Sequence, residues 1–238
     1  MREYYKKIYK GDKQSFMKGL EEDIVQEKRK CAVTANPEIF MLADRIPGVR
    51  ELLISEDTEI VADGIGIILG GKKLNYHMKE RIPGVEICSE LLSWAHKKHK
   101  SLYLFGAKPE AVKTLVRKVQ RQYSGIRLCG YENGYVKDKD QVFKRIAELK
   151  PDIILVALGA PKQELLIQKH KDKLEKGILI GVGGSFDVLS GMKKRAPKFF
   201  VKCNLEWLYR IATEPKRLKR FWNNNIKFLF AIRKEKHE

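Results

Sequence analysis

Six short apolar runs recur along this chain, and charged segments with helical spacing separate many of them. The runs cover residues 31–34, 59–62, 101–105, 126–130, 152–156 and 177–181. A period of about 3.6 residues, typical of amphipathic helices, marks the segments at 87–98, 109–123, 140–149 and 161–170. Strands that alternate with helices favour βαβ crossovers and a mostly parallel sheet. We therefore predict a Rossmann-like α/β fold, with ligands at the carboxyl ends of the strands.

The length of 238 residues suits one substantial core, and composition changes near its end. Residues 195–238 carry twelve Lys or Arg against four Glu, interleaved with aromatic residues. We predict a catalytic α/β core at 1–194 and a basic helical appendage at 195–238 that closes the active site and contacts membrane. The alternative for this segment is a solvated basic face over a packed apolar one.

The net charge of +18 predicts attraction to a polyanion, namely nucleic acid, anionic lipid or a phosphorylated substrate. The four cysteines are scattered without C-x-x-C spacing, which fits a reducing compartment and suggests neither a zinc site nor a disulfide framework. No apolar run approaches the roughly 18 residues of a spanning helix, and the amino terminus has no signal-peptide pattern. We expect a cytoplasmic protein that touches membrane only from its surface.

A glycine turn joins the last predicted strand to a helix start. The turn contains Gly183 and Gly184, and Ser185, Phe186 and Asp187 follow it. Glycines at such a junction let a phosphate approach backbone N–H groups and the positive end of a helix dipole. The turn predicts an anion site, with ordinary strand-to-helix loop chemistry as the alternative.

Polar residues also follow the first two predicted strands. Thr34 and Asn36 precede Pro37, and either could simply cap a helix that starts there. Asp63 and Gly64 follow the second strand, where a partly desolvated Asp could act as a general base or could cap a helix. Arg81 lies in a rigid turn and could bind a phosphate or carboxylate, or could be solvated.

A third polar loop, Gly159-Ala-Pro161-Lys-Gln163-Glu164, follows the fifth predicted strand. Gln163 and Glu164 could hydrogen-bond sugar hydroxyls, or could be helix formers on a wet face. Asp138 and Asp140 form a D-x-D pattern that can hold a divalent ion, but their place before a helix favours capping. The sequence predicts no metal site and no cofactor.

These motifs occur in a characteristic order. Thr-x-Asn-Pro-Glu, Ala-Asp-Gly, Arg-x-x-Gly, Gly-x-Pro-x-Gln-Glu and Gly-Val-Gly-Gly-Ser-Phe-Asp precede Arg-Ala-Pro, Leu-Glu-Trp-Leu-Tyr-Arg and Glu-Pro-Lys-Arg. From about residue 15 to 221 the chain resembles the WecG/TagA/CpsF family of bacterial glycosyltransferases.

The resemblance implies inverting transfer of a sugar from a UDP-sugar to N-acetylglucosamine on a polyprenyl diphosphate, at the inner face of the cell membrane. In the TagA branch the donor is UDP-N-acetylmannosamine, and the product is the linkage unit of wall teichoic acid. On matching positions, Asp63 is the expected base, and Thr34, Asn36, Arg81 and Gln163 line the cleft. Gly64, Gly159, Pro161, Glu164, Gly183, Gly184, Ser185, Phe186, Asp187, Arg210, Arg217 and Arg220 are the expected substrate contacts.

Arginines, rather than a divalent ion, are expected to stabilise the departing diphosphate. Other branches use uronic or glucosyl donors for capsule or exopolysaccharide, and the segment from Arg81 to Glu86 departs from the usual family turn, so the donor stays open.

Two other classes compete with a glycosyltransferase. A basic nucleic-acid-binding protein would also carry aromatics among lysines, but no recognised binding motif is present, and we expect no nucleic-acid partner. A nicotinamide-dependent enzyme would need a glycine-rich turn followed by an acidic residue about 20 positions on, which this chain lacks. A homo-oligomer with the apolar face of the appendage buried between subunits stays open.

Overall fold

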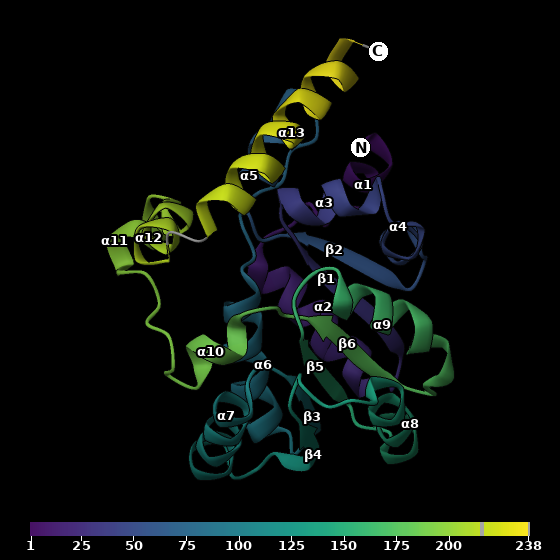
Figure 1. The fold of residues 1–238 in the computed structure, drawn as a ribbon. Helices are drawn as coiled ribbons and strands as arrows, with labels where there is room; N and C mark the ends of the chain where they lie inside the picture. The colour runs from purple at the N-terminus through teal and green to yellow at the C-terminus, as the bar shows by residue number, and fades with distance from the viewer. Residues whose placement is uncertain (215–216, 238) are drawn as a thin grey trace.

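A parallel sheet forms the centre of this computed structural model, which describes residues 1–214 and 217–237 apart from the side chains of Arg210, Arg217, Lys219, Arg220, Phe221, Lys236 and His237. The strands are β1 (Arg29–Ala35), β2 (Thr58–Ala62), β3 (Ser101–Gly106), β4 (Arg127–Glu132), β5 (Ile153–Ala157) and β6 (Gly177–Gly181). In the described part of the chain they form one sheet in the order β2-β1-β6-β5-β3-β4, and every pair is parallel (Figure 1). Each predicted strand is confirmed within two residues, and the Rossmann-like α/β class is confirmed.

Helices cover both faces of the sheet. On one face lie α1 (Arg2–Lys7), α3 (Pro37–Ala43), α4 (Pro47–Ile54), α5 (Ile65–Lys73), α8 (Lys139–Leu149), α9 (Lys162–His170) and α13 (Arg217–His237). On the other lie α2 (Lys13–Val25), α6 (Gly84–Lys97), α7 (Pro109–Gln122) and α10 (Ser185–Leu189). The short helices α11 (Lys198–Lys202) and α12 (Glu206–Thr213) and a 3₁₀ turn (Lys171–Lys173) complete the described elements.

Successive side chains of a strand point to opposite faces of the sheet, which produces two apolar cores. In β1, Cys31, Val33 and Ala35 face the first set of helices, whereas Ala32 faces the second. Side chains of a strand point to opposite faces in turn, so a parallel strand covered on both sides is apolar at nearly every position. The uninterrupted burial of β3, β5 and β6 follows from this arrangement.

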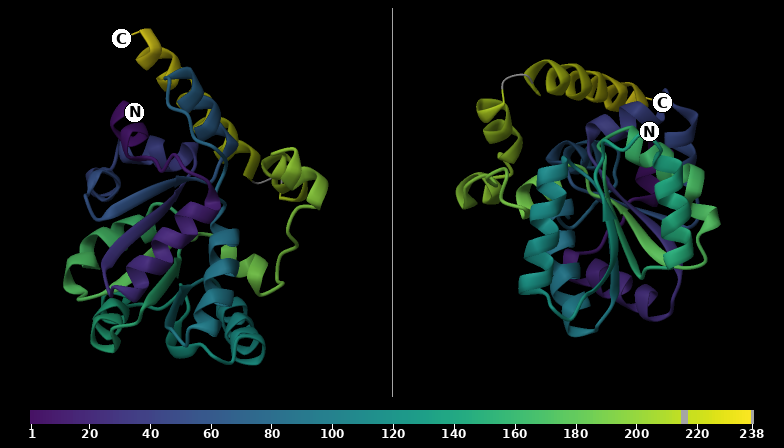
Figure 2. Two further views of the ribbon diagram at one scale, coloured as in Figure 1. Left: turned by 180° about the vertical axis from the view of Figure 1, so that it is seen from behind. Right: turned by 60° about the horizontal axis from the view of Figure 1, so that its bottom comes forward.

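The carboxyl-terminal segment divides into two parts. Figures 1 and 2 show α11 and α12 standing away from the sheet, whereas α13 returns and lies against α3 and α5. Phe228 and Ile232 of α13 are buried in the first core, and the ring of Phe228 lies 6.4 Å from that of Phe40, centroid to centroid. The predicted helical character of this segment is confirmed, while its division from the core at residue 195 stays a prediction.

A glycine in α5 allows α13 to pack closely against that helix. A Cβ atom built on Gly70 of α5 would lie only 2.9 Å from Cζ of Phe228. Beyond the ring, the carboxylate of Glu235 accepts a hydrogen bond from the amino group of Met1 at 3.0 Å. The last helix is therefore fixed to the first face of the sheet along much of its length.

Candidate active site

The loops that follow β1 and β6 lead to opposite faces of the sheet. After β1 the chain enters α3, whose Phe40 lies in the first core, and after β6 it enters α10, whose Phe186 lies in the second. Because β1 and β6 are neighbours, their carboxyl ends form a topological switch point, the position at which open parallel sheets bind ligands, and we refer to this predicted binding position as the crevice. The predicted site residues Thr34, Asp63 and Gly183 follow or end strands at this edge.

Thr34 and Asn36 have structural partners at the end of β1. The hydroxyl of Thr34 donates to the carbonyl oxygen of Gly181 at 2.9 Å and so joins β1 to β6. The backbone N–H of Ile39 donates to Oδ1 of Asn36 at 3.2 Å, and Pro37 occupies the first helical position. The capping alternative is thus confirmed for Asn36, and a role in lining the cleft stays a prediction for both residues.

Asp63 lies in a tight turn at the end of β2. The backbone N–H groups of Asp63 and Gly64 both donate to the carbonyl oxygen of Ala35, at 2.9 and 3.2 Å. Gly64, rather than Asp63, occupies the N-cap position of α5, so the capping alternative is wrong for Asp63. Its half-buried position at the rim of the crevice meets the steric requirement for a base that must reach a substrate hydroxyl.

Arg81 connects this turn to the carboxyl-terminal segment. Its Nε donates to the carbonyl oxygen of Asp63 at 2.6 Å, and its terminal nitrogens reach Oδ1 of Asn204 at 3.2 Å and Oε2 of Glu206 at 3.6 Å. The Arg81 side chain is only 12% exposed. The guanidinium therefore holds the Asp63 turn against the α11–α12 connection, which the sequence interpretation did not anticipate.

We predict that Arg81→Lys lowers the turnover number about tenfold or more, because a single ammonium cannot reproduce a planar fork that makes three contacts. Loss of a hydrogen bond to a charged group costs about 1.5–3 kcal/mol, enough to displace the Asp63 turn. Steady-state kinetics would measure the effect. The matched control is Lys79→Ala, which removes a neighbouring exposed cation paired with Asp12 at 3.2 Å. Equal effects of the two substitutions would contradict a specific role for Arg81.

The loops after β5 and β6 border open space. Gly159 and Gly183 adopt positive φ values of 74° and 50°, and Ala160–Pro161 is a cis peptide. A Cβ atom built on Gly159, Gly183 or Gly184 would meet no atom within 4 Å. A ligand could therefore approach the backbone here. However, the N–H of Gly183 already donates to Oε1 of Gln163 at 3.1 Å.

The remaining predicted contacts in this region are mostly buried. Gln163 and Glu164 are 5% and 1% exposed, so the alternative of helix formers on a wet face is wrong for both. Ser185 donates its hydroxyl to the carbonyl oxygen of Val182 at 2.7 Å, and Phe186 is fully buried. The Asp187 carboxylate lies 3.6 Å from the Lys193 ammonium. These residues support the turn, and direct substrate contacts by them stay predictions.

The side chains of Arg210, Arg217 and Arg220 lie outside the described residues, so their predicted place over the active site stays a prediction.

Gly84 is a neighbour of the crevice that the sequence interpretation missed. A Cβ atom there would lie 3.2 Å from Cγ2 of Thr34 and 3.6 Å from Oγ of Ser185, so the start of α6 lies beside the crevice. Its position directly after Pro83, at a helix start, was the available signal.

The D-x-D pattern lies elsewhere. Asp138 caps α8 by accepting from the N–H of Gln141 at 2.9 Å, which confirms the capping interpretation. Asp140 pairs with Lys169 and His170 of α9, each at 2.6 Å. Among the described side chains, no group of three or more His, Cys, Asp or Glu is placed to hold a metal ion.

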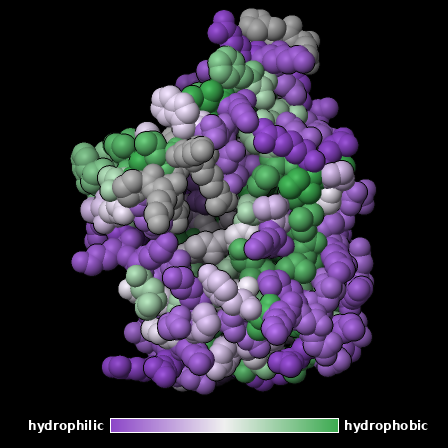
Figure 3. All heavy atoms as spheres, viewed as in Figure 1, coloured by the Kyte–Doolittle hydropathy of each residue, from purple (hydrophilic) through white to green (hydrophobic). Residues whose placement is uncertain are grey.

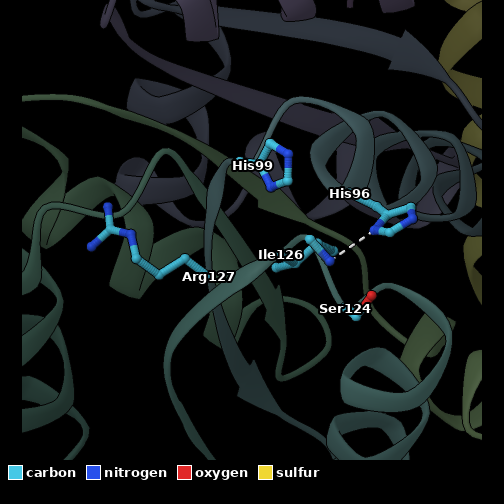
Figure 4. Close-up of a pocket in the computed structure, with 6 residues that line it drawn as sticks. His96, His99, Ser124, Ile126 and Arg127 are labelled. Atoms are coloured by element: carbon cyan, nitrogen blue, oxygen red, sulfur yellow. Dashed lines mark hydrogen bonds between the residues drawn. The ribbon is translucent and has the colours of Figure 1, made fainter.

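A cavity of about 500 Å³ opens at the other end of the sheet (Figure 4). It lies beside the end of α6 and the start of β4, where Nδ1 of His96 accepts from the N–H of Gly125 at 2.8 Å. Ligand sites in parallel sheets lie at the carboxyl ends of strands. This cavity is therefore separate from the candidate active site.

Comparisons with known proteins are consistent with the predicted class. The model of the "Glycosyl transferase WecG/TagA/CpsF family" matches residues 6–238. A Bacillus subtilis (strain 168) protein named N-acetylglucosaminyldiphosphoundecaprenol N-acetyl-beta-D-mannosaminyltransferase is 38% identical over 225 residues, which are 94% of this chain and 88% of that protein. Proteins of the same name from Bacillus spizizenii and Staphylococcus aureus (strain NCTC 8325 / PS 47) are each 40% identical over 207 residues, 87% of this chain and 80% of theirs. Because the family model matches nearly the whole chain and these relatives align over most of it, the chain belongs to the WecG/TagA/CpsF family of glycosyl transferases.

Proposed function

We propose that this glycosyl transferase moves N-acetylmannosamine from UDP-N-acetylmannosamine to the 4-hydroxyl of N-acetylglucosamine on undecaprenyl diphosphate, which forms the linkage unit of wall teichoic acid. The observation that carries the proposal is the alignment of 87–94% of the chain with relatives whose names state this sugar and this lipid-linked acceptor. The crevice between β1 and β6, with Asp63 at its rim, supplies a suitable place for the reaction.

In the proposed mechanism, the Asp63 carboxylate takes the proton from the acceptor hydroxyl. The hydroxyl oxygen attacks C1 of the donor sugar from the face opposite UDP, and the bond between C1 and the diphosphate oxygen breaks with inversion. UDP leaves with an added negative charge, which nearby cations and N–H groups stabilise. We assign this second task to Arg217 and Arg220 with the Gly183–Gly184 turn, as the family resemblance implies.

Donor identity is the part of the proposal to test first. The assay measures UDP released by the full-length protein with a short-chain lipid-diphosphate N-acetylglucosamine and either UDP-N-acetylmannosamine, UDP-N-acetylmannosaminuronate, UDP-glucose or UDP-glucuronate. We expect turnover with the first donor, and parallel reactions with EDTA should run at the same rate. Turnover only with another donor would assign the protein to capsule or exopolysaccharide synthesis, and loss of turnover in EDTA would overturn the proposed role of arginines in place of a metal.

We also propose that the protein acts as a peripheral enzyme at the cytoplasmic membrane face, where a lipid-linked acceptor would lie. No helix in the described ranges is both long and apolar enough to cross a bilayer. Figure 3 shows apolar side chains gathered over α11 and α12, and Phe199, Trp222 and Phe230 are 67%, 61% and 67% exposed. Exposed aromatics among lysines suit an anionic bilayer surface.

Vesicle flotation tests this membrane contact. We expect the protein to float with vesicles that contain anionic lipid and to float less at high salt, because each basic residue near the surface adds about 1 kcal/mol of attraction that salt screens. Phe199→Ser should reduce flotation, while Tyr135→Ser, a 70% exposed aromatic on the loop between β4 and α8, should leave it unchanged. Equal flotation with neutral and anionic vesicles would remove the electrostatic part of the proposal.

A further inference from the structure

Gln163 bridges two loops at the candidate active site through a single oxygen atom. Its Oε1 accepts from the backbone N–H of Gly159 and from that of Gly183, each at 3.1 Å. One of these glycines follows β5 and the other follows β6. The side chain is 5% exposed, so the bridge is a buried one.

The carboxylate of Glu164 determines which way the Gln163 amide points. Nε2 of Gln163 donates to Oε1 of Glu164 at 2.8 Å. If the amide were rotated by half a turn, its NH₂ group would face two N–H donors and its oxygen would face a carboxylate oxygen. An acceptor at position 164 therefore pairs the amide NH₂ group in the same orientation that lets Oε1 accept from both glycines, and reinforces the bridge.

Burial of the Glu164 carboxyl group costs free energy at this position. It is 1% exposed, and within the described part of the chain its Oε2 atom has no hydrogen-bond partner. Burial raises the pKa of the carboxyl group, since the charged form loses its hydration. A buried polar atom without a partner costs roughly 1–3 kcal/mol, so packing alone would favour an apolar side chain here. The cost is consistent with a requirement for the acceptor.

The backbone around the amide is shaped to fit it. A Cβ atom on Gly181 would lie 2.8 Å from Nε2 of Gln163, so only glycine leaves room for the amide at the end of β6. Beyond the amide, Gly159 and Gly183 face open space. The network thus fixes the separation of two backbone segments that border the same crevice.

We infer that Glu164 is a positioning residue: it orients the Gln163 amide, which holds the loops after β5 and β6 in the arrangement that binds the diphosphate of the donor. The inference rests on the proposed function for the identity of the ligand. It assigns Glu164 no contact with substrate.

The test compares Glu164→Leu with Glu164→Gln in the full-length protein. Both substitutions remove the charge, but only glutamine keeps an acceptor oxygen in the same place. We expect the leucine variant to raise the KM for the UDP-sugar and the Kd for UDP about tenfold, with the acceptor KM unchanged, because displaced loops after β5 and β6 weaken only diphosphate binding. The glutamine variant should stay within about threefold of wild type, since an amide oxygen accepts equally well.

A reciprocal exchange keeps the test decisive if the leucine variant does not fold. In Gln163→Glu two carboxyl groups would face each other, so donor binding should weaken by more than about tenfold. In the double variant Gln163→Glu/Glu164→Gln, the new carboxylate can accept from both glycines and from the new amide, and most of the lost affinity should return. Absence of recovery in the double variant, or wild-type donor KM in Glu164→Leu, would overturn the inference.

Hydrogen exchange separates this inference from the proposed function. The amides of Gly159 and Gly183 should be protected in wild type and should exchange about tenfold faster in Glu164→Leu, whatever sugar the enzyme transfers. If the wild type released no UDP from any donor, the proposed function would fail while the exchange rates still reported the bridge. Unchanged exchange in the leucine variant would overturn the bridge itself.

Discussion

Asp63→Asn is expected to slow sugar transfer about 10²- to 10⁴-fold, the range that a positioned general base contributes. Asparagine has the shape of aspartate but cannot take the proton from the acceptor hydroxyl. The turn itself should persist, because it is closed by the backbone N–H groups of Asp63 and Gly64 on the carbonyl oxygen of Ala35. Steady-state UDP release would measure the loss as a fall in the turnover number.

The control for this substitution is Asp172→Asn. Asp172 has a side chain that is 67% exposed and lies just before β6, at the amino end of the strand. It should retain wild-type turnover, because exposed ion pairs contribute about 1 kcal/mol at most. If Asp63→Asn kept more than about a tenth of wild-type activity, general-base catalysis of this size would be absent, and the base would have to be sought among other residues of the crevice.

Phe228→Ala should lower the free energy of unfolding by about 3–5 kcal/mol, the usual cost of deleting a buried ring. Phe228 is 1% exposed and lies against Phe40 and over Gly70, so its loss would leave a cavity between α13 and the first face of the sheet. Urea denaturation followed by circular dichroism would measure the change. We expect the midpoint to shift with little change of slope.

Phe230 offers a matched control two residues further along the same helix. It is 67% exposed, and Phe230→Ala should change the free energy of unfolding by less than about 0.5 kcal/mol. Comparable losses in the two variants would contradict the packing of α13 described above. Because Phe228 and Ile232 belong to the main core, point substitutions are a cleaner probe of the appendage than its removal.

Local sequence patterns predicted the fold well for a physical reason. The strands β3, β5 and β6 are short runs covered on both faces, so nearly every position in them is apolar, and glycine, proline or charged residues lie near their ends. Capping at Asn36 and Asp138 was visible for the same reason, since the cap and the N–H it satisfies lie three residues apart.

Contacts between distant segments could not be predicted in this way. Arg81 meets Asn204 across 123 residues, and Gln163 meets Gly183 across 20. No local rule specifies such pairs, because they depend on how strands are ordered in the sheet and where the last helices return. The resemblance to a family indicated which residues belong to the site. Their hydrogen-bond partners could be identified only from the structure.

The central position of β6 in the sheet also determines when the sheet can be completed during synthesis. Thr34 of β1 and Gly181 of β6 are hydrogen-bonded neighbours separated by 147 residues. Until the ribosome has delivered β6, the pair β2-β1 and the trio β5-β3-β4 would have nothing between them, and the facing edges of β1 and β5 would be open to pairing with other chains. Asp63 belongs to one part and Gln163 to the other, so a nascent chain acquires a catalytic crevice only when this late strand joins them.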